Sequence, residues 1–418
     1  RQRQMCIRDR FMNKQRAISV LQINTTANWG STGRIAEEIG QLVVSQGSGS
    51  YIAYGRGNPK SKSKLIHIGN DLDMKCHALQ SRLFGNHGLA SKQVTRTFIK
   101  QIDSIKPDIV HLHNIHGYYL NYEILFDYLA QLDIPIVWTL HDCWAFTGHC
   151  AYYSYVGCNR WRTLCHDCPQ KKSYPSSWFA DRSEQNFRDK LHAFTSVRNM
   201  TLVPVSAWLA EEVRLSFLKD YPIQVIHNGI DTDVFSPKQI CKSNLGLKDK
   251  FMILGVASVW ETRKGLDDFI KLRKLLSDDY SIVLIGLDEK QIKQLPKGII
   301  GIRRTNSIQD LVAYYSVADA YFNPTWEDNF PTTNLESLSC GTPVITYHTG
   351  GSVEAVDERT GFVVEQGNIA EVANIVEFIK EMGKEHWTFV CRERARNLYD
   401  KKERYMEYLH LYEKVVSL

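Results

Sequence analysis

The chain has 418 residues, of which 43% are apolar and 23% are charged, and its formal net charge is +5. A chain of this length is too long for one ordinary core, so we expect a globular protein of two domains. No apolar run approaches the roughly 20 residues of a membrane span, and the sequence therefore predicts no transmembrane helix.

The first ten residues, RQRQMCIRDR, form no apolar face and continue no pattern found in the rest of the chain. We therefore expect residues 1–11 to be a non-native appendage, with Met12 as the natural start. This segment holds four arginines and one aspartate, and without it the net charge falls to about +2. A nearly balanced charge argues against a nucleic-acid partner. Because no secretory segment is found, we expect a cytoplasmic protein with reduced thiols.

The first half of the chain alternates short apolar, β-branched runs with helical patterns. Runs that are nearly continuous in apolar residues are typical of parallel strands covered on both faces. The expected strands are Ile18–Asn24, Ser50–Tyr54, Asp108–His113, Ile134–His141, Thr201–Ser206 and Gln224–His227. The helical patterns are Arg34–Ser45, Val94–Ile105 and Tyr122–Leu132. This alternation predicts a doubly wound α/β domain.

The second half repeats the alternation. Its expected strands are Met252–Ser258, Ser281–Gly286, Ala320–Asn323, Val344–Tyr347 and Phe362–Val364, and its expected helices are Leu266–Leu276, Ile308–Tyr315, Thr333–Cys340 and Ile369–Met382. Between the halves, Pro237 and a polar stretch interrupt the pattern. We therefore predict two facing Rossmann-like domains, residues 12–238 and 239–391, and a C-terminal amphipathic helix, residues 392–418, that crosses back over them.

Two such domains enclose a cleft at the carboxyl ends of their strands, where ligands bind. After the first expected strand, a glycine turn with Gly30 and Gly33 leads into a helix. Free N–H groups at such a helix start suit a phosphate, whereas Ser31 or Thr32 as a simple helix cap is the alternative. The GxGxxG fingerprint is absent, which argues against a dinucleotide-dependent oxidoreductase.

Two further strands end in histidines. Alternation places His111 and His113 on one face of a strand, with His116 in the loop that follows. A strand-end histidine is more often a structural hydrogen bonder than a catalyst. His141 is expected at the mouth of the cleft, where a role in chemistry is favoured. Metal binding by His111 and His113 is a weaker alternative than hydrogen bonding.

In the second half, Arg263 and Lys264 form a pair of cations at a strand-to-helix turn. Two fixed positive charges at this place could neutralise a diphosphate, which needs such charge to depart as a leaving group. A solvated surface pair is the equal alternative for this loop viewed alone.

The most specific stretch runs from Asn323 to Pro343 and reads NPTWEDNFPTTNLESLSCGTP. We expect Asp328 and Glu336 to face the cleft, one toward a sugar and one toward a ribose diol, because carboxylates accept hydrogen bonds from paired hydroxyls. The amides near residues 330–333 would sit at a helix start and could hold phosphate. A helix cap at Asp328 is the simpler alternative, but it does not explain Glu336 inside an otherwise apolar helix face.

Together these residues resemble glycosyltransferase family 4, of the GT-B fold. The resemblance covers nearly all of the chain after Met12. It rests on Gly30–Arg34, His113, His141-Asp142, Val205-Ser206, Asn228–Asp231, Phe235–Pro237, Lys264-Gly265 and the stretch from Asp328 to Pro343. The resemblance implies a retaining transfer of a hexose from a nucleotide sugar, a UDP- or GDP-sugar, with no cofactor for catalysis and no required metal.

The resemblance also implies roles for single residues. Lys264 would bind the donor diphosphate, Asp328 the sugar and Glu336 the ribose. His141 would contact the sugar near the reacting carbon. We predict further donor contacts from Gly33, Arg263, Asn329, Phe330, Pro331 and Thr332, and acceptor contacts from His113 and Trp144.

Two positions depart from the family pattern. The family has Glu-x7-Glu, whereas this chain has Asp328-x7-Glu336, so either Asp328 or its neighbour Glu327 reaches the sugar. An Arg expected five residues before Lys264 is replaced by Val259. Arg263 is the residue that would supply the missing charge.

Five cysteines lie in an insert at residues 143–168. Cys150, Cys158, Cys165 and Cys168 could form a four-thiolate structural zinc site, at a spacing looser than that of common zinc modules. A set of reduced, partly buried thiols is the equal alternative. The aromatic residues of the insert form either an acceptor-sugar surface or a small core of the insert itself: Trp144, Tyr152, Tyr153, Tyr155 and Trp161.

Fold likeness alone does not prove turnover, so an epimerase of the same fold and a non-catalytic nucleotide-sugar binder are alternative functions. The resemblance extends to bacterial transferases that build surface polysaccharides on lipid-linked acceptors. It therefore implies a saccharide or lipid-linked acceptor and a peripheral contact with the inner face of the cytoplasmic membrane.

Overall fold

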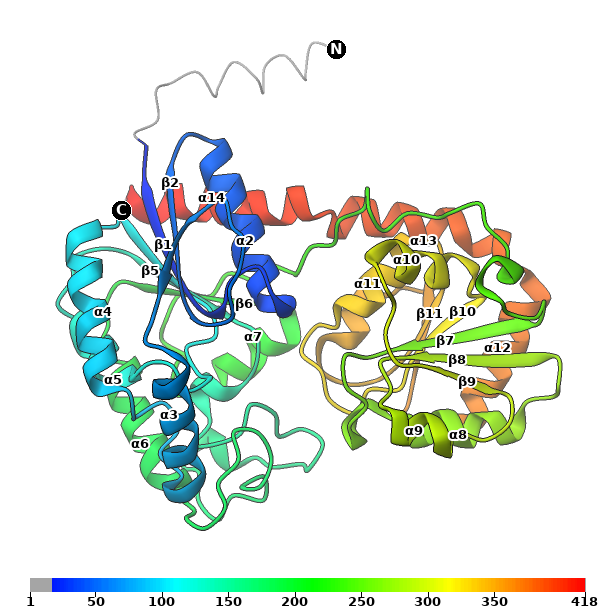
Figure 1. Ribbon diagram of the computed structural model, residues 1–418, viewed down its shortest axis with the longest axis horizontal. Helices are drawn as coiled ribbons and strands as arrows, with labels where there is room; N and C mark the ends of the chain where they lie inside the picture. Colours follow the sequence, from blue (N-terminus) through cyan, green and yellow to red (C-terminus); the bar gives the residue numbers. More distant parts are fainter. Residues whose placement is uncertain (1–16, 418) are drawn as a thin grey trace.

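Two parallel sheets of six strands each form the frame of the chain (Figure 1). The computed structural model describes residues 17–417, so the predicted appendage at residues 1–11 lies outside the described residues. The first sheet contains β1 (Ser19–Thr26), β2 (Gly49–Arg56), β3 (Lys64–His67), β4 (Ile109–Leu112), β5 (Ile136–Leu140) and β6 (Met200–Pro204). Its order, β3-β2-β1-β4-β5-β6, is that of a doubly wound Rossmann sheet and reverses between β1 and β4.

The helices of the first half follow from apolar residues repeated at helical spacing. In the first of them, Ile35, Ile39 and Val43 are four residues apart and fully buried, because they lie on the face that packs on the sheet. The helices are α2 (Gly30–Ser45), α3 (Asp71–Phe84), α4 (Lys92–Ile105), α5 (Tyr122–Leu129), α6 (Ser183–Phe194) and α7 (Ala207–Arg214).

The second half repeats this design. Its strands are β7 (Phe251–Val256), β8 (Tyr280–Ile285), β9 (Ile299–Ile302), β10 (Ala320–Asn323), β11 (Val344–Tyr347) and β12 (Gly361–Val364), in the order β12-β11-β10-β7-β8-β9. Counted from β7, this is again the Rossmann order. The helices are α8 (Leu266–Leu275), α9 (Glu289–Gln294), α10 (Ile308–Val317), α11 (Thr332–Ser339) and α12 (Ile369–Met382). The predicted fold of two Rossmann-like domains is confirmed.

The C-terminal segment returns to the first domain, as predicted, but as two helices rather than one. These are α13 (Lys384–Tyr399) and α14 (Lys401–Val416), the red segment along one edge of both halves in Figure 1. The chain bends at Asp400, whose carboxylate accepts a hydrogen bond from the Lys402 N–H and whose backbone bridges to Ile230. Beyond the bend, α14 buries Tyr408, Tyr412 and other residues in one cluster with apolar residues of β1, β4, β5, β6 and α2.

One strand prediction is wrong, and two strands of the structure were not predicted. Gln224–His227 is not a strand, since only Ile223, just before it, forms an isolated bridge, to Leu202. Two strands, β3 and β9, were not predicted. Both lie at a sheet edge and are partly exposed, so they lack the continuous apolar run that marks a strand buried on both faces.

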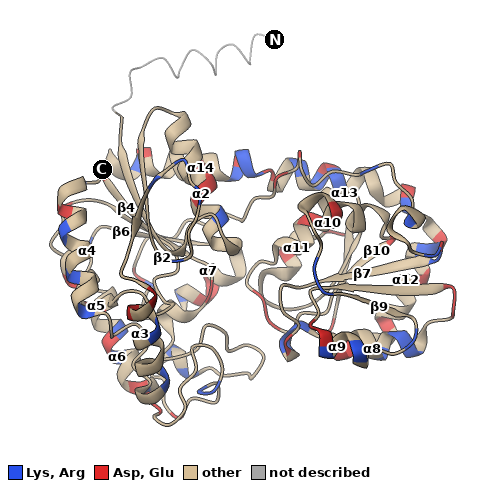
Figure 2. Cartoon of the chain, in the orientation of Figure 1, with Lys and Arg blue, Asp and Glu red and all other residues tan. Residues whose placement is uncertain are grey.

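Acidic and basic residues alternate along the helices of both halves in the cartoon of Figure 2. Within residues 17–417, no helix has both the length and the apolar character needed to cross a membrane.

Candidate active site between the two domains

An acidic loop between β10 and α11 lies at the carboxyl edge of the second sheet and faces the first domain. Asn323, the last residue of β10, donates its side-chain N–H to Asn334 Oδ1 in α11 at 2.8 Å. The loop is closed further by the Thr325 hydroxyl, which donates to the Glu327 carbonyl at 3.1 Å. These buried bonds fix Glu327 and Asp328 at the edge of the sheet where ligands of such folds bind.

Lys264 and Asp328 form the charged centre of this edge. Lys264 lies in the turn between β7 and α8, and its Nζ is 2.5 Å from Asp328 Oδ2. Gly265, which follows, has a φ of 74°, and a Cβ there would collide with the Pro324 carbonyl. Glycine at this position therefore lets the cationic turn approach the acidic loop closely.

Arg263 links the same loop to the first domain. Its Nη1 donates to the Glu327 carbonyl at 3.3 Å, and its guanidinium lies 4.7 Å from the ring centre of Tyr152 in the cysteine-containing insert. The residue thus lies beside the acidic loop rather than in bulk solvent, which argues against the alternative of a solvated surface pair.

Glu327 points away from Asp328 and toward the first domain. Its carboxylate Oε1 accepts hydrogen bonds from the Ser154 hydroxyl at 2.9 Å and from the Tyr155 N–H at 3.0 Å. The side chain is only 3% exposed. Nearby, the Tyr155 ring meets the Trp326 ring edge-on at 5.8 Å. Two carboxylates were considered for the sugar. Glu327 is hydrogen-bonded to Ser154 and Tyr155 of the insert, whereas Asp328 pairs with Lys264.

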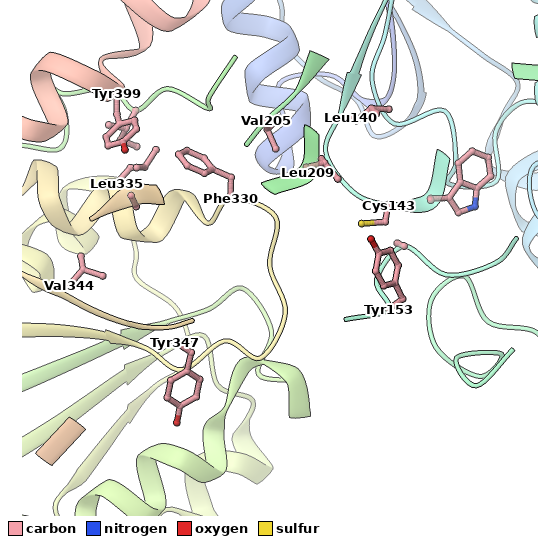
Figure 3. Packing of buried hydrophobic residues seen from close by; sticks show 14 of the residues in the cluster. Leu140, Cys143, Tyr153, Val205, Leu209, Phe330, Leu335, Val344, Tyr347 and Tyr399 are labelled. Carbon is pink, nitrogen blue, oxygen red and sulfur yellow. The ribbon is translucent and has the colours of Figure 1, made fainter. Parts of the chain in front are cut away.

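The start of α11 provides free backbone donors. Its N-cap is Pro331, whose side chain makes no capping bond, so the first amides of the helix, including that of Thr332, are open to a ligand. Phe330 anchors this start by packing against Tyr399 at 5.9 Å (Figure 3). Asn329 reaches across the cleft and donates its side-chain N–H to the His141 carbonyl at 2.8 Å. Asn329 thereby ties the loop before α11 to the end of β5 at His141.

Glu336 lies one turn into α11. Its Oε2 accepts a hydrogen bond from the Tyr315 hydroxyl at 2.9 Å. Burial raises the pKa of Glu336 to about 7, and the Tyr315 bond and the Arg34 guanidinium of the first domain only partly oppose this shift. The carboxyl therefore titrates near neutral pH, at a place reached by charges of both domains.

The histidines of the first sheet form a neutral hydrogen-bonded chain. The Gln22 side chain donates to the Ala36 carbonyl, so its Oε1 accepts from His113 Nε2 at 3.0 Å. His113 Nδ1 must then accept from His141 Nε2 at 3.1 Å. Burial lowers the pKa of His141 to about 4 and that of His113 well below its ordinary value. His113 is thus buried behind His141, where it fixes the orientation of that ring.

His111 is structural. Its Nδ1 is 2.6 Å from the Tyr412 hydroxyl of α14, and its Nε2 is 2.8 Å from Thr139 Oγ1. Both ring nitrogens are therefore engaged, and the weaker alternative of a metal on His111 and His113 has no support.

Gly33 lies inside α2, because the helix begins at Gly30 and not after the glycine turn. A Cβ at Gly33 would be 2.5 Å from Thr26 Oγ1, so glycine is needed here for the helix to pack on β1. The alternative of a helix cap at Ser31 or Thr32 is wrong, since the N-cap is Trp29 and makes no side-chain bond.

Trp144 lies in the core and not on an open surface, being 1% exposed. Its ring packs edge-on against Tyr122 at 5.8 Å, and the buried Lys190 ammonium lies 3.5 Å above it. The same loop is held by Asp142, whose Oδ2 is 2.8 Å from His116 Nε2. The predicted acceptor contact of Trp144 would require its ring to leave this packing.

The cysteine insert has a core of its own around Trp161, whose ring centre lies 5.1 Å from that of Phe146 and 4.9 Å from that of Tyr153. Tyr152 and Tyr155 instead face the second domain. Among residues 17–417, no group of three or more His, Cys, Asp or Glu is arranged to hold a metal ion. Burial raises the pKa of Cys165 to about 11. The zinc site at Cys150, Cys158, Cys165 and Cys168 stays a prediction, which metal analysis of the purified protein tests.

Some residues that join the domains were not predicted. Ser154 and Tyr155 hold Glu327, and Asn329 reaches His141, although no motif marks these contacts. Glu354 is a further example: its carboxylate is 2.9 Å from His227 Nε2 and accepts from two N–H groups at the start of α7. In the sequence, only its position shortly after the end of β11 could have indicated that Glu354 contacts the first domain.

Comparison with known proteins agrees with this geometry. The family described as Glycosyltransferase Family 4 matches residues 55–234, and that described as Glycosyl transferases group 1 matches residues 250–380. The chain is 24% identical to a putative colanic acid biosynthesis glycosyl transferase of Escherichia coli K12, over 95% of this chain and 100% of that protein. It is 26% identical to the N,N'-diacetylbacillosaminyl-diphospho-undecaprenol alpha-1,3-N-acetylgalactosaminyltransferase of Campylobacter jejuni, over 50% of this chain and 58% of that protein.

Solved structures share the fold. The sucrose-phosphate synthase of Thermosynechococcus elongatus superposes with a TM-score of 0.71 at 15% identity, over 96% of this chain and 100% of that one. The Anabaena HepE protein in complex with UDP superposes with a TM-score of 0.67 at 14% identity, with the same coverage. The two matched segments together take in most of the chain, one in each domain, and the solved structures share its architecture, so the protein is a glycosyltransferase of the GT-B fold with a family 4 match in its first domain and a group 1 match in its second.

Proposed function

We propose that this glycosyltransferase moves a hexose, with retention of configuration, from a nucleoside-diphosphate sugar to a saccharide or lipid-linked acceptor. The observation that carries the proposal is the 2.5 Å ion pair of Lys264 and Asp328 beside the open start of α11. In a nucleotide sugar the diphosphate and the sugar are directly bonded, so the groups that serve them must be neighbours. Lys264 then serves the diphosphate and Asp328 the sugar.

The remaining contacts of the donor follow from this placement. Arg263 and the N–H groups of Thr332 and Thr333 at the start of α11 add positive charge around the diphosphate, and Glu336 accepts hydrogen bonds from the ribose. These fixed charges supply what a divalent cation supplies in other transferases, so we propose a transfer that needs no metal.

For the retaining course, the bond between the sugar and the phosphate oxygen breaks while the acceptor hydroxyl attacks the same face of the sugar. The departing phosphate oxygen takes the proton of that hydroxyl. His141 is neutral at pH 7, because burial lowers its pKa to about 4, and its ring lies beside the sugar in this proposal, while its carbonyl is held by the Asn329 side chain. The protein thus stabilises charge on the leaving diphosphate and on the oxocarbenium-like sugar.

The relatives support the acceptor class. One is a putative colanic acid biosynthesis transferase, and another bears a diphospho-undecaprenol compound in its name. We therefore propose a role in surface-polysaccharide biosynthesis, with the acceptor presented at the inner face of the membrane.

A panel of UDP- and GDP-sugars tests the proposal. We expect at least one donor to raise the melting temperature, and the product formed with an acceptor to keep the anomeric configuration of the donor by proton NMR. Chelation by EDTA should leave the rate unchanged. The proposal fails if no donor shifts the melting temperature or if the product is inverted.

A further inference from the structure

A second hollow opens in the first domain, outside the acidic loop. It is a cavity of about 440 Å³, lined by seven residues of which three are cationic and none is acidic. The cations are Arg56, Lys75 and Arg82, and the two aromatic residues are Tyr118 and Tyr174. A cavity of this size lies within the range that holds small ligands.

Separate elements bring the cations together. Arg56 is the last residue of β2 and lies at the carboxyl end of that strand, the edge of the sheet where His141 also lies. Lys75 and Arg82 are seven residues apart on α3 and therefore lie on one face of that helix. Tyr118 follows β4 and has a φ of 71°, a left-handed conformation that is unfavourable for tyrosine.

The positive charges of this cavity have no acidic partners. Within residues 17–417, none of the three cations forms an ion pair with a carboxylate. Arg56 donates from Nη2 to the Gly117 carbonyl and from Nε toward the Met74 sulfur, each at 3.3 Å. Its Nη1 is left for a ligand. Three cations around one cavity repel one another, and a bound oxyanion would relieve that repulsion.

The cavity connects to the reaction centre through two hydrogen bonds. His116 Nε2 donates to Asp142 Oδ2 at 2.8 Å, and His116 Nδ1 is hydrogen-bonded to the Tyr174 hydroxyl at 3.0 Å. Asp142 directly follows His141 in the chain. The Tyr174 wall of the cavity is thus two side chains away from the residue expected at the reacting sugar.

We propose that this cavity binds the phosphoryl group of a phosphorylated acceptor. This inference rests on the proposed function, since it names the acceptor class of the same transferase. The Arg56 and Arg82 guanidinium groups and the Lys75 ammonium are the side chains that proteins use for phosphate oxygens, and a diphosphate offers enough oxygens for all three. The Tyr118 and Tyr174 rings would flank the first sugar, with its hydroxyl directed toward His141.

Calorimetric titration with inorganic pyrophosphate tests the site without any donor. The whole protein should show two classes of sites, the cavity and the donor cleft. The Lys75→Ala/Arg82→Ala variant should weaken pyrophosphate binding in the cavity roughly tenfold or more and leave binding in the donor cleft unchanged. Lys264→Ala should weaken binding in the donor cleft and leave the cavity unchanged. Both α3 side chains are exposed, so the variant should fold, which circular dichroism checks.

The matched control is Arg96→Ala/Lys100→Ala, which removes the same charge from an exposed face of α4. It should leave both classes of sites intact. Equal pyrophosphate binding by the α3 variant and the whole protein would overturn the proposal, and so would equal weakening by the α4 control.

Competition then separates the sources of the phosphoryl group. A sugar 1-phosphate and a sugar diphosphate with a short prenyl tail should both displace pyrophosphate from the cavity, and the stronger of the two identifies a soluble or a lipid-linked acceptor. Displacement by an unphosphorylated sugar at the same concentration would count against the site. Thermal shifts induced by nucleotide-sugar donors are measured separately and test the proposed function, which fails if no shift is seen in the whole protein. The pyrophosphate titration decides independently whether the cavity binds phosphoryl groups.

Discussion

Glu327 of the second domain accepts a hydrogen bond from the Ser154 hydroxyl of the first domain at 2.9 Å. The two residues are 173 positions apart, and the bond joins the acidic loop to the cysteine insert. A buried carboxylate that holds two donors from the opposite domain fixes the distance between the domains at the mouth of the cleft. The two neighbouring carboxylates of this loop therefore differ, since Asp328 pairs with Lys264 while Glu327 holds the domains together.

This division predicts coupling between Glu327 and Ser154. Glu327→Ala removes the hydrogen bonds with Ser154 and Tyr155 that join the domains, and we expect kcat/KM to fall roughly tenfold to hundredfold, which is about 1.4–2.7 kcal/mol. Ser154→Ala should cost less, and the double variant should lose little more than Glu327→Ala alone. Strictly additive losses in this double-mutant cycle would contradict the coupling between Glu327 and Ser154.

Asp328 should behave differently. Asp328→Asn keeps the shape but removes the charge next to the sugar, and we expect turnover to fall by about 10²–10³. Glu327→Gln, the matched change one residue earlier, keeps an oxygen for Ser154 and Tyr155 and should lose only a few-fold by the same reasoning. Steady-state rates of both variants decide between the two carboxylates, and the reverse order would assign the sugar to Glu327.

Lys264→Ala should abolish most of the transfer while the fold survives. The side chain is half-buried at the surface of the cleft, so its loss removes charge near the leaving diphosphate without opening the core. We expect kcat to fall by about 10²–10³, as for other groups that stabilise transition-state charge. Lys274→Ala, an exposed lysine of α8, is the control and should be neutral. Near-normal turnover of a folded Lys264→Ala protein would refute the role.

The central strands could be predicted from the sequence closely, and the contacts between the domains could not. Ala320–Asn323 was predicted with its observed bounds, because four consecutive buried residues leave a continuous apolar pattern. The helix α3 left no such signal, since its Leu72 and Leu79 are exposed rather than core-facing. Likewise Ser154 and Arg82 look like ordinary polar surface residues until the fold brings them beside the Glu327 carboxylate and the second cavity.

Glu336 predicts a pH dependence of donor binding. Burial raises the pKa of Glu336 to about 7, so the carboxyl is mostly protonated at pH 6 and mostly ionised at pH 8. The ionised form accepts two ribose hydroxyls, whereas the protonated form has lost part of that capacity. Donor affinity should therefore increase with pH, by up to about tenfold between pH 6 and pH 8.

Calorimetry with a nucleotide sugar measures this dependence, because its diphosphate does not titrate in that range. Glu336→Gln should bind more weakly at pH 8 and show a flat profile. A profile that keeps its slope in the Gln variant would assign the titration to another group.

Tyr412 predicts how far α14 stabilises the first domain. Its hydroxyl donates to His111 Nδ1 at 2.6 Å in a buried contact, and Tyr412→Phe leaves that nitrogen without a donor. An unsatisfied buried acceptor costs about 1–3 kcal/mol, so the free energy of unfolding of the first domain should fall by that amount in urea. Lys414→Ala, an exposed change two residues further along α14, should stay within about 0.5 kcal/mol. If Tyr412→Phe is equally neutral, the bond to His111 does not stabilise the domain, and α14 is held by apolar packing alone.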